Sequence, residues 1–533
     1  MPIHHNFSGL GQLAIFPLDV LRLILLKAGG RKVRILNNGL KRLFDEANKT
    51  LTLFGSESQH LSDDESLKLI SNVIRSSRAL ISVIVWNNRV TTILNIVPLL
   101  AATHKGLKLF QLCCKDLGPS DITSLAPSLM AWTGLRTLIL SDNGLNATRI
   151  DALRPVFLAL TRLQVLDLSG NMLEPADAAS LAPALMVLAG LISLDLSLNN
   201  IGAVGMQSLA PSLEKLTGLT KLNLFRNGLY SDGAASLTSC LVILTRLCDL
   251  NLMSNSFQVS GTVSLAPSLM RLTNLTTLDF RDNDMGQDGA TSFASALMAL
   301  TMLQNLTISG NGIGPAGAAS LAPSLKMLKG LHRLILSYNY MGSDGTTSLA
   351  PSFRVLEGLH SLHISSNNIG PAGAASLVPA LSVLKGLYEL DISSNNIGPA
   401  GAASLASSFF MLTTLNVLKL SHNDLGPAGA AALAPVLMML TRLRILDLYC
   451  NNIGSAGAAS LAPSLAMLTG LKSLNLSLNN LGADGTETLI PALMALTQLG
   501  LLHFRCNNLG LEKTAWLKST LMALSPLHFL DID

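Results

Sequence analysis

The chain has 533 residues, of which 49% are hydrophobic, 4% aromatic and 13% charged. This length exceeds one ordinary compact core, and so apolar a chain must bury much of its surface against itself. The formal net charge of +4 is small for this length, which argues against a nucleic-acid partner.

Residues 1–49 are predicted to form short helices that cap the first element of the following array. The stretch from Phe16 to Leu25 places Pro17 near the first position of a helix, where its missing N–H is harmless. Gly29 and Gly30 break this helix, and apolar residues from 36 to 47 predict further helical turns.

The stretch Phe16-Pro-Leu-Asp-Val-Leu21 also resembles the F-box family, which opens with Leu-Pro-x-Asp/Glu-Val/Leu-Leu. The family's later Val-Cys-Lys-x-Trp tract stands here as Asn38-Gly-Leu-Lys-Arg-Leu43, without the Cys or Trp. The resemblance implies that an Skp-type adaptor of a cullin ubiquitin ligase binds these residues: Phe16, Pro17, Leu18, Leu21 and Ile24. A plain helical cap remains the alternative.

Residues 50–106 are predicted to be degenerate leading repeats, and residues 107–533 a regular array. From Leu107 to Leu527 a leucine recurs every 28 residues, without insertion or deletion. Each opens the phrase L-x-x-L-x-L-x-x-N-x-L, as from Leu387 to Ile397, and a Gly/Ala-rich segment follows. Before the array, Leu80 to Val90 is a copy one residue out of register, and Leu51-Thr-Leu53 predicts a still earlier strand.

This phrase resembles the leucine-rich-repeat family, and the repeat length and helical second half resemble its ribonuclease-inhibitor-like subclass. The resemblance implies an α/β solenoid, a horseshoe with a parallel β-sheet on the concave face and helices on the convex face. Leu387, Leu390 and Ile392 are expected to point inward, while Glu389, Asp391 and Ser393 point outward.

Two further columns carry structural predictions. The asparagine of the phrase is expected to be buried, where its amide satisfies backbone groups of the turn. A proline recurs in the helical half, as at Pro323 and Pro351. Because an interior proline opposes a helix, the helix is predicted to be kinked or to begin late.

Partner-binding residues are sought where the outward columns depart from Ser, Asp and Asn. Phe225, Met253 and Arg281 replace serine in three adjacent repeats, and Arg226 and Asp282 flank them. Exposed aromatic, Met and Arg side chains in one patch are typical of an interface hot spot. Drift on an idle surface is the alternative. Two thinner clusters are also predicted, and they comprise Tyr338, Tyr340, His363 and Tyr388, and then Tyr449, His503 and Arg505.

No catalytic, cofactor or metal site is predicted. The acidic residues near Asp282 lack the spacing of a Ca²⁺ loop, and His332 and His360 lack a third zinc ligand. The chain contains no Walker, His-Glu-x-x-His or Gly-x-Ser-x-Gly motif. We therefore expect a binding protein and not an enzyme.

The leading functional hypothesis is an F-box-like substrate receptor, with a protein ligand on the concave face and an adaptor at the N-terminus. The alternatives are a free-standing scaffold or inhibitor, and a Ran-type GTPase activator. The scattered cysteines and the lack of a signal peptide or membrane-spanning run predict a cytoplasmic or nuclear protein. We expect a monomer with no nucleic-acid and no membrane partner.

Overall fold

The computed structural model describes residues 50–54, 71, 74, 80–86, 90–114, 117–522 and 527–532. The helices predicted in residues 1–49 and the predicted adaptor-binding residues, Phe16, Pro17, Leu18, Leu21 and Ile24, lie outside this part of the chain. Two compact units meet between Asn199 and Asn200. We call them unit 1 and unit 2, and each is described by itself.

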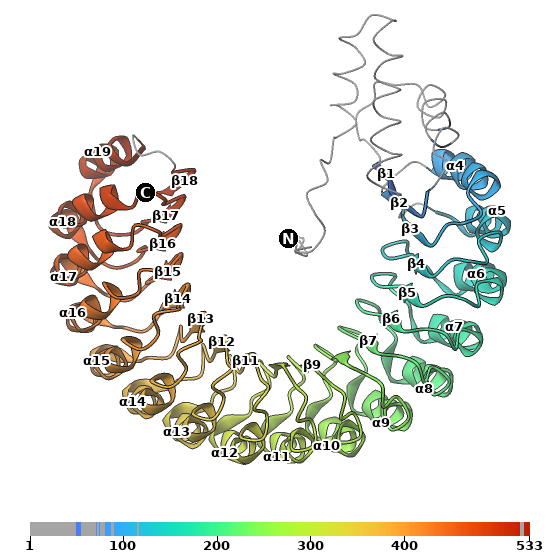
Figure 1. The fold of residues 1–533 in the computed structure, drawn as a ribbon, viewed down its shortest axis with the longest axis horizontal. Coiled ribbons are helices and arrows are strands. Elements are labelled where there is room, and N and C mark those ends of the chain that lie inside the picture. The colour runs from blue at the N-terminus through green and yellow to red at the C-terminus, as the bar shows by residue number, and fades with distance from the viewer. Residues whose placement is uncertain are drawn as a thin grey trace, which may run out of the picture. The chain divides into compact units, whose positions relative to one another are not determined.

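Unit 1 alternates strands and helices, and its strands pair in parallel (Figure 1). Its strands are β1 (Thr50–Phe54), β2 (Ser82–Trp86), β3 (Leu109–Cys113), β4 (Thr137–Ile139), β5 (Val165–Asp167) and β6 (Ser193–Asp195). Its helices are α4 (Val90–Thr103), α5 (Pro119–Met130), α6 (Ala147–Ala159) and α7 (Pro175–Val187). β1 and β2 match the two strands predicted ahead of the regular array.

Unit 2 continues the alternation as an arc with strands on the inner side and helices on the outer side (Figure 1). Its strands are β7 (Lys221–Asn223), β8 (Asp249–Asn251), β9 (Thr277–Asp279), β10 (Asn305–Thr307), β11 (Arg333–Ile335), β12 (Ser361–His363), β13 (Glu389–Asp391), β14 (Val417–Lys419), β15 (Ile445–Asp447), β16 (Ser473–Asn475), β17 (Leu501–His503) and β18 (Phe529–Asp531). Its helices are α8 (Gly202–Leu213), α9 (Tyr230–Leu241), α10 (Gln258–Leu269), α11 (Gly286–Leu297), α12 (Gly314–Leu325), α13 (Gly342–Phe353), α14 (Gly370–Leu381), α15 (Gly398–Phe409), α16 (Gly426–Leu437), α17 (Gly454–Met467), α18 (Gly482–Ala495) and α19 (Leu511–Met522).

The strand register follows the sequence period. In the pairing of β12 with β13, Leu362 faces Leu390, and the neighbouring residues pair in the same 28-residue step. Both leucines are completely buried, because alternate residues of a strand point to opposite faces and the helices cover only one of them. The parallel sheet and its helical layer confirm the predicted solenoid.

The predicted asparagine ladder is also confirmed. The Asn395 side chain has no exposed surface. Its Oδ1 accepts a hydrogen bond from the backbone N–H of Asn367 at 2.8 Å, and its Nδ2 lies 2.9 Å from the carbonyl oxygen of Ile364 in the preceding repeat. Asn367 and Asn423 repeat the pattern. Each repeat therefore satisfies backbone groups of its neighbour.

The prediction of a late-starting helix is wrong. α12 begins at Gly314 and runs past Pro323 to Leu325. Pro323 lies on the exposed side of the helix, and Ala319, whose carbonyl loses its usual helical partner, is exposed as well. Water can hydrate that carbonyl, which reduces the cost of the proline.

Backbone with positive φ recurs between each strand and the next helix. Tyr338 and Tyr340 have φ values of 59° and 54°, and Gly342 follows at 65°. A left-handed residue turns the chain sharply, and only glycine adopts it without strain. We call these segments of unit 2 the strand-end rim. In the part of the chain that the structure describes, no helix has the length and apolarity needed to span a membrane.

Candidate binding face

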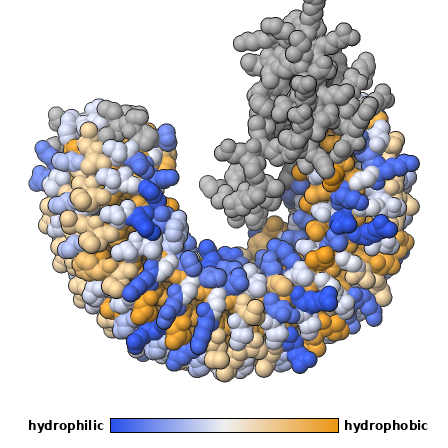
Figure 2. Space-filling model, in the orientation of Figure 1, coloured by the Kyte–Doolittle hydropathy of each residue, from blue (hydrophilic) through white to orange (hydrophobic). Residues whose placement is uncertain are grey.

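The inner side of unit 2 is built from the residues that flank the buried leucine of each strand. Hydrophilic residues lie along much of this side (Figure 2). The buried column is leucine in each strand from β7 to β17, whereas its neighbours differ from strand to strand, for instance Arg333 in β11, Glu389 in β13 and Val417 in β14. The buried leucines are therefore the same in successive repeats, whereas the exposed residues of the inner side vary.

Charged side chains gather at the middle of this face. Glu389 Oε2 lies 3.1 Å from His363 Nε2 and 3.9 Å from Arg333 Nη1, which reaches across the intervening strand. The Ser361 hydroxyl donates a hydrogen bond to the same oxygen at 3.1 Å. Alongside, Lys419 Nζ lies 3.7 Å from Asp391 Oδ2. We call these six residues the central charge cluster.

The electrostatics of the cluster favour an ionised Glu389. The contact with His363 lowers the pKa of Glu389 to about 2, against a desolvation cost that acts in the other direction, and Ser361 and Arg333 also lower it. In β15, burial raises the pKa of Asp447, and the negative charge of Asp391 also raises it, whereas the hydrogen bond from the backbone of Tyr449 and the charge of Lys419 lower it. The ionised form of Glu389 is therefore favoured by its surroundings, whereas the ionised form of Asp447 is disfavoured by its burial.

We expect the stabilisation from Glu389 to disappear in acid. A carboxyl whose pKa is lower in the folded state stabilises the fold above its ordinary pKa, here 4.5, and this contribution is lost as the pH falls toward about 2. Glu389→Gln should lower the free energy of unfolding by about 1 kcal/mol near neutral pH, since solvent screens the half-exposed group. Urea denaturation between pH 2 and pH 7 measures the difference, which should shrink toward zero at the acidic end.

Glu357→Gln is the matched control, because Glu357 is exposed in the connection between α13 and β12. It should leave the free energy of unfolding nearly unchanged at neutral pH. A Glu389→Gln deficit that stays constant down to pH 2 would contradict the role given to ionised Glu389.

The first predicted patch comes together. Phe225, Met253 and Arg281 follow β7, β8 and β9 in one column, where the Arg226 N–H donates to the Met253 carbonyl at 2.9 Å. Phe225 and Met253 are half-buried. Arg281 Nε lies 3.0 Å from both oxygens of Asp279, which raises the pKa of the arginine. Arg226 and Asp282 are exposed with φ of 53°, so they lie on the strand-end rim beside the patch.

The second predicted cluster is divided among three surfaces. Tyr338 and Tyr340, 63% and 74% exposed, lie on the strand-end rim. His363 belongs to β12 and to the central charge cluster. Tyr388 is 51% exposed and immediately precedes β13, at the opposite end of the strands from the rim. The four residues therefore lie at three different places along the strands.

The third cluster lies near the last strands. The Tyr449 ring packs edge-on against His422, with centroids 4.8 Å apart. Arg505 Nε lies 2.9 Å from Asp531 Oδ1, and His503 Nδ1 lies 3.4 Å from the other oxygen of this carboxylate. Asp531 thus links His503 and Arg505, while Tyr449 is placed beside the rim.

The expectation that the serine column points outward is wrong. Ser337, Ser365 and Ser393 are only 6–9% exposed. Ser365 donates a hydrogen bond to the Ser337 hydroxyl at 2.8 Å, since the chain turns after each strand and this small side chain lies against the adjoining repeat. Larger residues such as Phe225 and Tyr449 also occupy this column, and their side chains are partly exposed.

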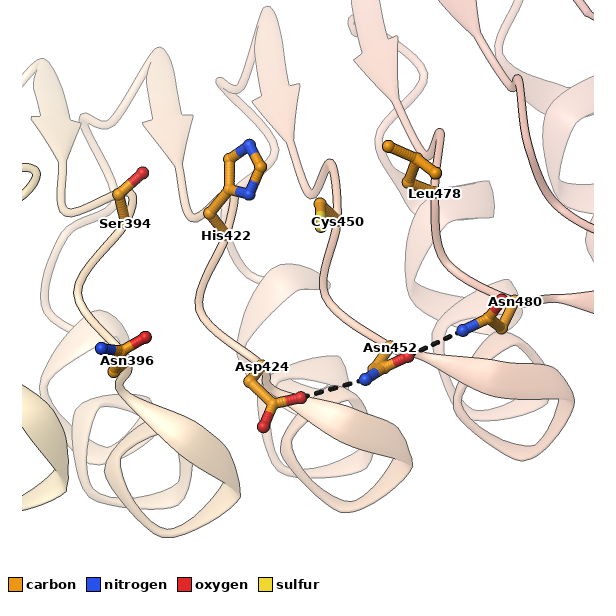
Figure 3. A pocket seen from close by; sticks show the side chains of 8 residues that line it. All are labelled: Ser394, Asn396, His422, Asp424, Cys450, Asn452, Leu478 and Asn480. Carbon is orange, nitrogen blue, oxygen red and sulfur yellow. Dashed lines mark hydrogen bonds between the residues drawn. The ribbon is translucent and has the colours of Figure 1, made fainter.

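A groove of ≈ 560 Å³ follows the strand-end rim over four successive repeats. Its lining residues are Ser394, Asn396, His422, Asp424, Cys450, Asn452, Leu478 and Asn480 (Figure 3). Amide hydrogen bonds join its floor: Asn452 donates to Asp424 at 3.2 Å, and Asn480 donates to Asn452 at 2.7 Å. The groove offers polar groups to an extended ligand.

The central charge cluster is the part that reading the sequence missed, except for His363. The signal was present, since Arg333 and Glu389 occupy one strand position two repeats apart, and Lys419 and Asp391 share another. These charged positions lie in the strands themselves, whereas the first predicted patch follows the serine column after each strand. Among the described residues, no group of three His, Cys, Asp or Glu side chains could hold a metal ion.

Eight segments match the family model described as Leucine Rich repeat, and they are residues 191–210, 271–294, 299–322, 359–378, 387–406, 412–434, 440–462 and 469–489. A search of curated proteins gave no match. Among solved structures, the chain is similar to an internalin, inlF, from Listeria monocytogenes, at 20% identity over 71% of this chain and 82% of that one, with a TM-score of 0.38.

It is also similar to a chain of a TLR13–ssRNA13 complex, at 19% identity over 86% of this chain, with a TM-score of 0.44. Here the match spans 65% of the other chain. The matched segments begin near the opening leucines and run into the following helices, as from Leu387 to Ala406 in β13 and α15. The chain therefore contains leucine-rich repeats.

Proposed function

We propose that this chain is a protein-binding receptor of the F-box-like type. In this proposal the inner face of unit 2 selects one protein partner, and residues 16–24 dock the Skp-type adaptor of a cullin ubiquitin ligase. The repeats belong to the ribonuclease-inhibitor-like subclass, which the 28-residue period and the regular helix of each repeat support.

The observation that carries protein binding is the central charge cluster. Arg333 and Lys419 keep 45% and 36% of their side chains exposed, while their carboxylate partners keep 22% and 14%. Half-desolvated charges on a fixed backbone can exchange their internal contacts for contacts with a partner of complementary charge. The Phe225, Met253 and Arg281 patch on the same side supplies apolar contact area.

The adaptor half of the proposal is supported by the stretch Phe16-Pro-Leu-Asp-Val-Leu21. A cytoplasmic or nuclear location follows from the same proposal, because the adaptor and the cullin act there. We further propose that the chain has no catalytic activity of its own, in keeping with the binding role of its repeats.

The test is capture with the full chain as bait, using a purified Skp-type adaptor with its cullin and, separately, a cell lysate. The full chain should retain the adaptor, and Leu21→Asp should abolish this, because a charge on the apolar face is costly to bury. Leu23→Asp is the matched control, since it makes the same replacement on the side of the predicted helix opposite to Leu18, Leu21 and Leu25.

A second pair of variants tests the inner face. The double variant Arg333→Glu and Lys419→Glu should lose the lysate partner about tenfold or more while keeping the adaptor. The control double variant Lys385→Glu and Lys472→Glu makes the same charge change outside the inner face. If the adaptor fails to bind the full chain, the segment is only a cap and the scaffold alternative stands. If both double variants keep the partner, the inner face is not its site.

A further inference from the structure

The connections from each helix to the next strand of unit 2 form a surface that neither the fold nor the proposed receptor accounts for. In the described residues these connections run from the C-terminal ends of α8–α18 into β7–β17. We call this surface the helix-end edge. It lies at the other end of the strands from the strand-end rim.

Exposed apolar side chains, many of them methionines, recur along this edge. Nearly every repeat places one there, with 39–58% of its surface exposed: Val242, Ile243, Met270, Met298, Met302, Met327, Val355, Phe410, Met411, Met438, Met439, Met467 and Met494. The buried leucines that hold the connections alternate with them; Leu300, Leu328 and Leu440, for example, are completely buried. Single exposed apolar residues need no explanation, but a row over consecutive repeats marks a binding surface.

The same edge is basic. Its lysines and arginines are Lys215, Arg246, Arg271, Lys326, Lys329, Arg354, Lys385, Arg442, Arg444 and Lys472, whereas its acidic residues are Glu214 and Glu357. The strand-end rim carries Asp282, Asp284 and Asp424 beside Arg226, Arg281 and Arg505, and the first turns of the helices that follow it add Asp232, Asp288, Asp344 and Asp484. Cations near helix C-termini also suit the helix dipole, which accounts for the sign of the charge but not for the methionines.

The charge restricts the occupant. A second copy of the chain placed edge to edge would set basic residues against basic residues. The chain's own residues 1–49 are also rich in basic residues, among them Lys27, Arg31 and Lys32. The edge therefore suits a partner that is both anionic and apolar, and that presents the same chemistry over the length of many repeats.

We infer that the helix-end edge of unit 2 binds the surface of an anionic phospholipid membrane. Interfacial protein surfaces combine lysine and arginine with apolar side chains that enter the boundary between headgroups and acyl chains. Methionine suits this role because its unbranched side chain adapts to a fluid surface. The contact is peripheral, and anionic lipids are found on the cytoplasmic leaflet.

This inference does not rest on the proposed receptor function. The prediction of no membrane partner rested on the lack of one continuous apolar segment. The helix-end edge is instead distributed over many connections, and only the 28-residue register brings its side chains into one row.

The experiment is co-sedimentation of the full chain with phosphatidylcholine vesicles that contain or lack about one third phosphatidylserine. At low salt, the bound fraction on anionic vesicles should exceed that on neutral vesicles about tenfold, and 0.5 M salt should remove most of this difference. The variant Met298→Gln, Met327→Gln, Met439→Gln and Met467→Gln keeps the charge and should bind several-fold less. Circular dichroism checks that it remains folded.

The matched control replaces four exposed apolar residues elsewhere on unit 2, Val204→Gln, Val259→Gln, Val263→Gln and Tyr340→Gln, and should bind like the unaltered chain. A separate charge variant, Arg271→Gln, Lys326→Gln, Arg354→Gln and Arg442→Gln, should lose the preference for anionic vesicles.

Two results would overturn the proposal. The first is no sedimentation with anionic vesicles at low salt, including the case in which a synthetic acidic amphipathic helix binds the edge instead and identifies a protein partner. The second is sedimentation that the methionine variant leaves unchanged, which would place the membrane contact elsewhere, for instance in residues 1–49.

Discussion

Asn395→Ala should lower the free energy of unfolding by about 3–5 kcal/mol, because it leaves several buried backbone groups without a partner at once. The Asn395 side chain serves the N–H of Asn367 in the preceding repeat and carbonyl oxygens of both repeats, at 2.8–3.1 Å. Alanine removes these hydrogen bonds, and the site is completely buried. Urea denaturation followed by circular dichroism measures the loss.

The neighbouring residue supplies the control. Asn396 is exposed, and its amide donates only to Asn368 at 2.9 Å. Its φ of 52° makes glycine the fitting replacement, since alanine would add backbone strain. Asn396→Gly should change the free energy of unfolding by about 0.5 kcal/mol or less. Equal losses at Asn395 and Asn396 would refute the buried ladder as the source of stability.

Gly485→Ala should destabilise the fold by about 1–3 kcal/mol, although the same change in most helices is stabilising by about 1 kcal/mol. Gly485 lies in α18 against α17, and a Cβ there would sit 2.8 Å from the Cα of Ser455 and 3.2 Å from the Cβ of Ala458. The nearest atom belongs to the backbone and cannot rotate away. The two helices would have to separate.

The control for this prediction is Gly386→Ala, in the exposed connection before β13. There the nearest atom to an added Cβ is the Glu357 carbonyl oxygen at 4.0 Å, an ordinary contact distance. Its effect should stay within about 0.5 kcal/mol. A stabilised Gly485→Ala variant in urea denaturation would show that the helix spacing is looser than the close approach at Ser455 requires.

The repeated frame could be predicted from the sequence because its signals are local and occur many times. The period fixes the strand register, and an obligatory asparagine among apolar residues indicates a buried amide, as Asn395 proved to be. The late helix start predicted from the proline column is wrong because the general cost of an interior proline depends on which side of the helix the proline occupies. Pro323 lies on the exposed side of α12, where water compensates for the missing N–H.

The binding surface was harder to predict, since it depends on which positions of the repeat are exposed and on the side of the repeat where they lie. The serine column would alternate outward if the strand continued, but β13 ends at Asp391, two residues before Ser393, and Ser393 is buried. Tyr338 and Tyr388 were grouped by residue type, but Tyr338 follows β11 and Tyr388 precedes β13, so they lie at opposite ends of the strands. Arg333 and Glu389 meet because both share one register position with Ser361 and the arginine reaches across β12.

The asparagine ladder has a consequence for how such an array changes in length. Each repeat interface uses the same hydrogen-bond donors and acceptors. Removal of one whole period, such as residues 303–330, would therefore bring together two surfaces that can form the same asparagine hydrogen bonds. A change in the number of whole repeats is then expected to cost little stability, so recombination between similar copies can change the length of the array. A gain or loss of any other number of residues would break the ladder. Evolution can therefore extend or shorten the inner face in steps of one strand, and each step adds or removes one small set of surface residues.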